Sequence, residues 1–114
     1  MKHETRAPTD FRVLGQRYTV AFVKGLKDKK HGKLLGRTHL DHGRVELDPE
    51  AANDKRVETY LHEVLHVVFH TARVLRPKGT TEEDMITALA PALVHTLRDN
   101  PDMVGYLMKG DTDD

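Results

Sequence analysis

The chain has no cysteine among its 114 residues. This absence excludes a disulfide-stabilised scaffold, a cysteine-based zinc finger and catalysis by a thiol. An excess of charge of either sign is missing too, because 18 Lys and Arg residues balance 18 Asp and Glu residues. A net charge of zero gives no overall attraction to nucleic acid or to a membrane surface, so binding partners have to be argued from local features.

Long apolar runs are also missing. Residues 1–6 are polar and lead into Ala7-Pro8-Thr9-Asp10 without the apolar stretch of a signal peptide, and no segment reads as a membrane span. We therefore expect a cytoplasmic protein with no membrane partner. A chain of this length is expected to form one domain over residues 1–114, with frayed ends at 1–9 and 110–114.

The first half of the chain predicts a small, mostly antiparallel sheet. Tyr18, Val20 and Phe22 alternate with polar residues and so share one face, the expected floor for helices. Short turns separate the apolar runs, which makes two hairpins. The predicted strands are residues 11–14, 18–23, 34–40 and 44–47, and a glycine-punctuated basic loop at 24–33 lies between the hairpins.

The second half changes to helical spacing, which predicts an α+β fold. A first helix starts at Asp48-Pro49 or at Asn53-Asp54 and ends before Pro77 and Gly79. A second helix opens at 80–83, and Asn100-Pro101 separates it from a short final helix. The apolar face of the second helix is expected to join the core; it comprises Met85, Ile86, Leu89, Ala90, Leu93, Val94 and Leu97.

His62-Glu63-Val64-Leu65-His66 is the segment that bears most directly on function. Two histidines four residues apart lie on one face of a helix, where both imidazoles can bind one zinc ion, Zn2+. Glu63 between them is then placed to accept a proton from a metal-bound water, which is the chemistry of metal-assisted hydrolysis. The motif predicts metal ligands at His62 and His66 and a catalytic base at Glu63.

A catalytic zinc site needs a third protein ligand. His70 continues the spacing, but its Cα lies about 12 Å along the helix from that of His62, too far to share one ion. His95 lies deep in the second helix and could be a ligand if the two helices ran close there, but a half-buried position at a helix interface is the preferred expectation. Glu82 and Glu83 lie at the start of that helix, which a short connection brings back beside the first. Thr80 and Glu83 also fit a capping box, in which Glu83 would only cap the helix.

The segment 59–66, followed by Glu83-x-x-Ile86-x-x-Leu89-Ala90-x-x-Leu93, resembles the minimal gluzincin metallopeptidases. Within them it is similar to the ImmA/IrrE-like domains and to small relatives carried by phages and mobile elements. The resemblance implies a small sheet before the motif helix. It also implies zinc ligands at His62, His66 and Glu83, with Glu82 as the alternative to Glu83, and Glu63 as the base.

Together these features predict a zinc-dependent peptidase that acts on a peptide or protein substrate. The substrate is expected to add as a strand to an exposed edge, for which 34–40 is the candidate. Tyr60, Tyr106 and His95 are candidates for stabilising the oxyanion, and the sequence favours none of them. The substrate itself and the oligomeric state are not indicated by the sequence.

Two other functions stay open. In the first, the same ligands hold zinc only to stabilise the fold, Glu63 has no catalytic role, and the domain is a binding or regulatory module. In the second, the basic loop 24–33 contacts nucleic acid. The second is disfavoured because this loop has no aromatic residue for base stacking and its lysines are typical of a solvated loop.

Overall fold

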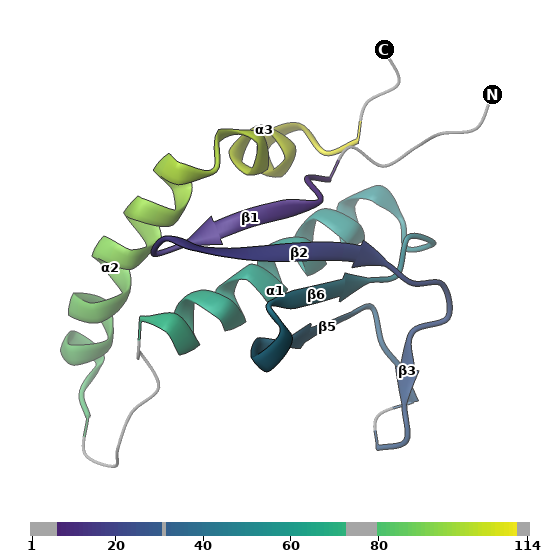
Figure 1. Cartoon of the computed structure of the whole chain (residues 1–114), viewed down its shortest axis with the longest axis horizontal. Helices are drawn as coiled ribbons and strands as arrows, with labels where there is room; N and C mark the ends of the chain where they lie inside the picture. The colour runs from purple at the N-terminus through teal and green to yellow at the C-terminus, as the bar shows by residue number, and fades with distance from the viewer. Residues whose placement is uncertain (1–6, 31, 73–79, 112–114) are drawn as a thin grey trace.

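The computed structural model describes residues 7–30, 32–72 and 80–111. One four-stranded sheet, a separate two-stranded hairpin and three helices make up this part of the chain, which confirms the predicted α+β fold. The main sheet has the order β1-β2-β6-β5 (Figure 1), with β1 at Asp10–Val13, β2 at Gln16–Phe22, β6 at Arg44–Leu47 and β5 at Gly36–His39.

The two predicted hairpins are both present. β1 pairs antiparallel with β2 through a turn at Leu14 and Gly15, whose φ angles are 49° and 86°. Positive φ at both turn positions matches the twist of the strands on either side, and glycine adopts it without strain. β5 pairs antiparallel with β6 across the short 3-10 helix η1 (Leu40–His42).

A parallel pairing of β2 with β6 joins the two hairpins into one sheet. No local pattern in the sequence predicts this pairing. It places β6 in the interior of the sheet and leaves β5 at one edge, because β6 is the only neighbour of β5 among the described strands. The sheet is therefore mostly antiparallel, as predicted, and segment 34–40 does include an edge strand.

The basic loop contains a small hairpin of its own, made of β3 (Lys27–Asp28) and β4 (Gly32–Lys33). Leu26 at its base is 3% exposed. The backbone N–H of Leu34 donates to the carbonyl of Leu26 at 2.8 Å, which extends the pairing toward the main sheet. These contacts fix the base of the hairpin, while its lysines are exposed. We call the described residues of this loop, 24–30 and 32–33, the basic hairpin.

Three helices follow the sheet: α1 (Asn53–Thr71), α2 (Glu82–Asp99) and α3 (Pro101–Lys109). The first helix begins at Asn53, the later of the two predicted starts. Its predicted end before Pro77 and Gly79 lies outside the described residues. α1 runs along one face of the sheet (Figure 1) and buries Tyr60, Val64, Val67 and Val68 against it. The side chains of Phe11, Tyr18, Val45 and Leu47 complete this core.

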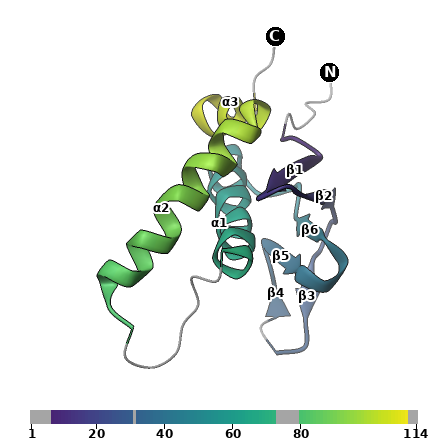
Figure 2. The ribbon, with the colours of Figure 1, turned by 60° about the vertical axis from the view of Figure 1, so that its left-hand side comes forward.

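The prediction that the apolar face of α2 joins the core is wrong for most of its length. Ile86 is 50% exposed and Val94 43%, whereas the buried residues of this helix are Ala92 and Thr96. The end of α2 is held to β1 because Asn100 donates to the carbonyl of Arg12 and accepts from its N–H. The start of α2 projects away from the sheet (Figures 1 and 2), so its apolar side chains have no sheet to pack on.

Both ends of the described chain are anchored inside the segments expected to fray. Ala7 is 6% exposed, and the carbonyl of Thr9 accepts a hydrogen bond from the N–H of Val20. Asp111 is buried and forms an ion pair with Arg56 of α1. The remaining expected frayed positions, 1–6 and 112–114, lie outside the described residues. No helix in the described part of the chain is both long and apolar enough to cross a membrane.

Candidate functional site

His62 and His66 lie one turn apart on the exposed side of α1. Their Nε2 atoms are 3.2 Å apart, and their ring centroids are 4.8 Å apart. The opposite side of the helix carries Val64, Val67 and Val68 into the core, and this burial fixes which way the histidines face. The structure thus brings together the two residues that the motif predicts as ligands, which we call the histidine pair.

The histidine pair fits a zinc ion by its donor geometry. Two nitrogens that each lie 2.0–2.1 Å from zinc, at a tetrahedral angle, are separated by about 3.3 Å. The Nε2 atoms of His62 and His66 are already at this separation. Imidazole nitrogen is a preferred zinc donor, so the pair supplies half of a tetrahedral donor set.

Glu63 is 5% exposed and lies beside the histidine pair. Its Oε1 accepts a hydrogen bond of 2.6 Å from the hydroxyl of Thr38 on β5. Gly36 provides the room for this carboxylate: a Cβ added there would lie 3.0 Å from Oε2 of Glu63 and 2.8 Å from a side-chain carbon of Thr59. A buried carboxylate with one hydroxyl donor is incompletely compensated, and a cation nearby would stabilise it.

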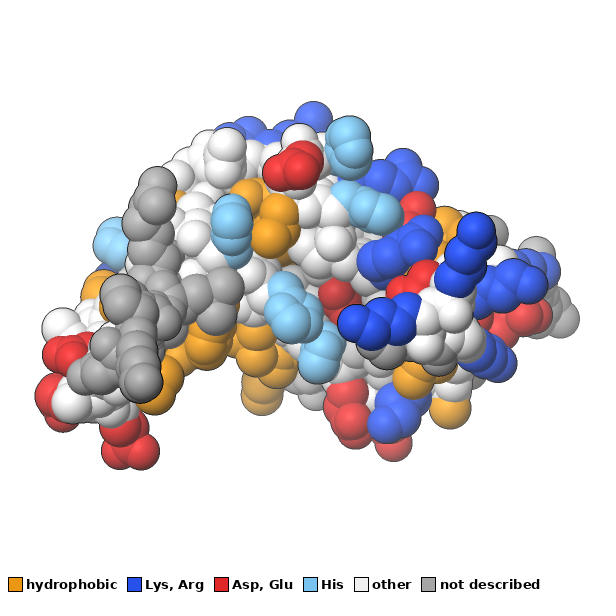
Figure 3. Space-filling model, turned by 90° about the horizontal axis from the view of Figure 1, so that it is seen from below, with side chains coloured by type: hydrophobic (Ala, Val, Ile, Leu, Met, Phe, Trp, Pro, Cys, Tyr) orange, Lys and Arg blue, Asp and Glu red, His pale blue; other side chains and the backbone are white. Residues whose placement is uncertain are grey.

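A cleft of about 950 Å³ opens over these residues between α1 and β5. Its wall is largely apolar, with the histidine pair, Glu63 and Thr38 as its polar groups together with His70, Asp28 and Arg37; the apolar lining comes from Leu34, Leu40, Leu65 and Phe69. An apolar cleft with a few converging polar groups is the usual form of a ligand site. Figure 3 shows histidines in the middle of one face, with Lys and Arg gathered on the right-hand side and Asp and Glu both at the left-hand end and among the Lys and Arg.

The predicted third ligand is not assembled with the histidine pair. Glu83 is exposed in the first turn of α2, where Thr87 donates a 3.4 Å hydrogen bond to it. Figure 2 shows the start of α2 apart from the end of α1. Within the described ranges, no group of three or more His, Asp or Glu side chains is arranged to hold a metal ion. Glu82, the alternative, is likewise exposed on the same turn.

The capping alternative for Glu83 is wrong by one residue. The N-cap of α2 is Thr81, whose hydroxyl accepts from the N–H of Asp84 at 3.1 Å. The carboxylate of Asp84 accepts in return from the N–H of Thr81, also at 3.1 Å. Asp84 therefore closes the capping box, and Glu83 is not needed for it.

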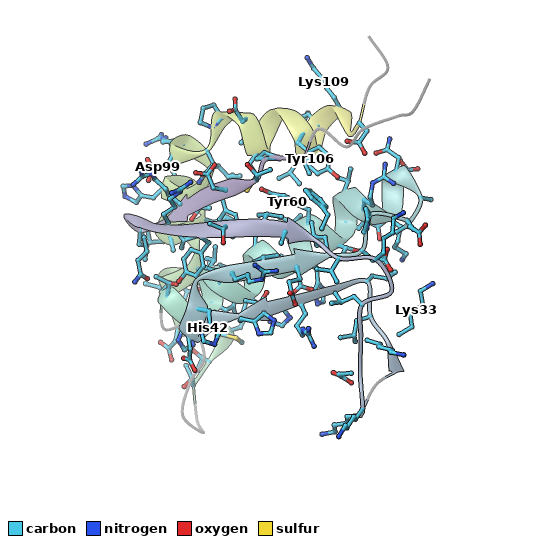
Figure 4. The ribbon with its side chains drawn as sticks, turned by 45° about the vertical axis from the view of Figure 1, so that its right-hand side comes forward. Lys33, His42, Tyr60, Asp99, Tyr106 and Lys109 are labelled. Atoms are coloured by element: carbon cyan, nitrogen blue, oxygen red, sulfur yellow. The ribbon has the colours of Figure 1, made fainter. Side chains whose placement is uncertain are left out.

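Tyr60 and Tyr106, two of the candidates for oxyanion stabilisation, are part of the core and not of the cleft. They are 1% and 4% exposed, and their rings meet edge to face at 5.3 Å between α1 and α3 (Figure 4). The hydroxyl of Tyr60 donates to the carbonyl of Pro8, and burial raises the pKa of this tyrosine. His95, the third candidate, does not line the cleft, and the expectation that it is half-buried at a helix interface is wrong because it is exposed on α2.

The opposite face of the sheet carries a charged cluster that was not predicted from the sequence. Glu46, 8% exposed, accepts hydrogen bonds from Arg37, His39 and Arg44. Burial alone would raise the pKa of Glu46, but the hydrogen bonds from His39, Arg37 and Arg44 outweigh it and lower the pKa to about 2. The sequence did carry a signal for this cluster, because polar residues occupy every second position of two predicted strands. We call these four residues the outer-face cluster.

Comparison with protein-family models, with curated proteins and with solved structures finds no match to this chain.

Proposed function

We propose that this chain is a zinc-dependent metallopeptidase. The observation that carries the proposal is the separation of 3.2 Å between the Nε2 atoms of His62 and His66, next to a buried glutamate and inside one cleft. His62 and His66 would hold the metal, and Glu83 is proposed as the third ligand, with Glu82 as its alternative. A cytoplasmic location is part of the same proposal.

The chain's own residues would divide the hydrolysis between them. Zinc held by these residues would lower the pKa of a water and polarise the carbonyl to be attacked. Glu63 would accept a proton from the attacking water and pass it to the leaving amine. Thr38 holds one carboxylate oxygen of Glu63 and leaves the other free to receive that proton.

The edge strand β5 supports a peptide substrate. Its outer edge has no strand partner among the described residues, so an extended chain can pair with its backbone. Thr38 and Gly36 of this strand line the cleft together with Glu63. A chain paired with β5 would therefore pass beside the proposed base.

A zinc-stabilised binding or regulatory module is the second candidate. Two observations favour it: Glu83 is not assembled with the histidine pair, and the carboxylate of Glu63 already has a structural partner in Thr38. In this function the same residues hold zinc, and Glu63 serves only to join α1 to β5.

Metal content and cleavage, measured together, separate the two functions. We expect one zinc per chain by mass spectrometry in protein purified without a polyhistidine tag, and its loss in His62→Ala. A fluorogenic peptide library should be cut by the zinc-loaded protein and not by Glu63→Gln, which should keep its zinc and its fold. Zinc bound without cleavage by either protein would favour the binding module. Absence of zinc from the wild type would refute both.

A further inference from the structure

The two sides of the β5 segment differ in chemistry. Leu34, Gly36, Thr38 and Leu40 line the cleft. Between them, Arg37, which also borders the cleft, and His39 direct their side chains to Glu46 on the opposite face of the sheet. Because side chains alternate along a strand, β5 separates an apolar wall from a polar one.

The polar wall has an excess of positive charge. In the outer-face cluster, one carboxylate accepts hydrogen bonds from two guanidinium groups, so at least one positive charge is not neutralised within the cluster. The side chains of Arg37 and Arg44 are 35% and 44% exposed, which leaves part of each guanidinium group open to a partner. Their contacts with Glu46 hold both groups in fixed positions.

The basic hairpin, which leads into β5, carries further positive charge. Lys27 and Lys33 are directly opposite each other across the strand pair β3–β4. Like charges in this arrangement destabilise a hairpin. No ion pair joins either lysine to an acidic residue in the described part of the chain, and Lys33 projects away from the hairpin into solvent (Figure 4). An anionic partner would relieve this repulsion.

We propose that the edge of β5 binds an extended polypeptide in which acidic and apolar residues alternate. Its apolar side chains would enter the cleft beside Leu40, Leu65 and Phe69. Its acidic side chains would face Arg37 and the lysines of the basic hairpin. The inference names the substrate class of the proposed peptidase, and it rests on that function only in the claim that the bound chain is cut.

The alternation favours a polypeptide over a nucleic acid. A strand places successive side chains on opposite sides, which matches one apolar and one cationic wall. A nucleic acid strand carries a charge at every unit, and a regular run of charge does not match a cleft whose lining is largely apolar. The basic hairpin also has no aromatic residue on which a base could stack.

Binding of short fluorescein-labelled peptides to the full chain carrying Glu63→Gln, which cannot cut them, tests the proposal by fluorescence anisotropy. The first peptide alternates valine and glutamate, the second has the same residues in two blocks, and the third alternates valine and glutamine. A single-stranded oligodeoxynucleotide is the fourth probe. Every probe is measured with added zinc and with a chelator.

We expect the alternating acidic peptide to bind about tenfold more tightly than either other peptide, because several exposed ion pairs act together. The double variant Lys27→Glu, Lys33→Glu should lose most of this preference. The matched control Lys55→Glu, Lys109→Glu reverses two exposed lysines elsewhere and should keep it.

Equal binding of the alternating and block peptides would overturn the proposal, and so would tighter binding of the oligodeoxynucleotide that depends on the same two lysines. Preferential binding of the alternating peptide to a protein that cuts nothing would keep the proposal and refute the peptidase function. Cleavage of library peptides by a protein that does not prefer the alternating peptide would support the peptidase function and refute the proposed substrate class.

Discussion

The hydroxyl of Thr38 donates a hydrogen bond of 2.6 Å to the carboxylate of Glu63, and so joins the edge strand β5 to the motif helix α1. The contact connects the strand proposed to bind substrate with the residue proposed to move the proton. Removing it should therefore affect catalysis more than metal binding.

For Thr38→Val we expect zinc content to stay at the wild-type level and kcat to fall with little change in KM. The isosteric side chain keeps the packing but leaves a buried carboxylate oxygen without its donor, which also costs about 1–3 kcal/mol of stability. Thr38→Ser retains the hydroxyl and should recover most of the rate. Equal kcat values for the valine variant and the wild type would show that the hydrogen bond does not position Glu63.

Gly36→Ala should lower the free energy of unfolding by about 1–3 kcal/mol, because the new methyl group would overlap Thr59 and the carboxylate of Glu63. Urea denaturation monitored by circular dichroism measures this change. Gly105→Ala in α3 is the matched control, because no atom lies within 4 Å of its added Cβ. It should be neutral or stabilise the helix by up to about 1 kcal/mol. An unchanged free energy of unfolding in Gly36→Ala would mean that β5 and α1 can move apart at this position.

Glu46 makes stability depend on acidic pH. Its pKa in the folded chain, about 2, lies below the ordinary value of 4.5, so its contribution is fully present above pH 4.5 and is lost as the pH falls toward 2. We expect a loss of about 1–2 kcal/mol over this window, less than the shift alone implies, because the arginine partners are partly exposed. Urea titrations at several pH values should show a shallower acid dependence in Glu46→Gln. If the free energy of unfolding of Glu46→Gln fell with pH as steeply as that of the wild type, Glu46 would not be the group responsible.

Glu83→Gln should weaken zinc binding by about tenfold or more, because an amide oxygen is a poorer ligand than a carboxylate. Glu82→Gln serves as the control, because Glu82 lies on the same helical turn and is likewise exposed. Competition with a chromogenic zinc chelator measures both affinities. A larger loss of zinc affinity in Glu82→Gln would make Glu82 the third ligand in place of Glu83. An unchanged affinity in both variants would mean that α2 supplies no carboxylate ligand to the histidine pair.

Local patterns predicted the elements well. Strand alternation located β1, β2 and β6, and residues near Asn53 and Asn100 marked helix ends, because these signals depend on neighbours in the sequence. The parallel pairing of β2 with β6 depends on segments far apart and left no local signal. The capping box was displaced by one residue because Thr80 and Thr81 are both followed three positions later by an acidic residue.

Helical periodicity also misled in one case. It identified the apolar face of α2 but carries no information about what that face packs against, and Ile86 and Val94 turn out to be exposed. In the site, the histidine pair was predictable because spacing on one helix fixes it. Thr38 and Gly36 were not, because they reach Glu63 from a different element.

The parallel pairing of β2 with β6 sets the order in which the chain can fold. Each of the hairpins β1–β2 and β5–β6 joins neighbouring segments and can form within microseconds. Joining the hairpins requires closing the chain between β2 and β6, which we expect to be the slower step because the paired segments lie farther apart in the sequence. The strand that forms one wall of the cleft can therefore be paired before the opposite wall, α1, has a sheet to pack on. Substitutions that weaken the β2–β6 pairing would delay completion of the cleft without touching any residue that lines it.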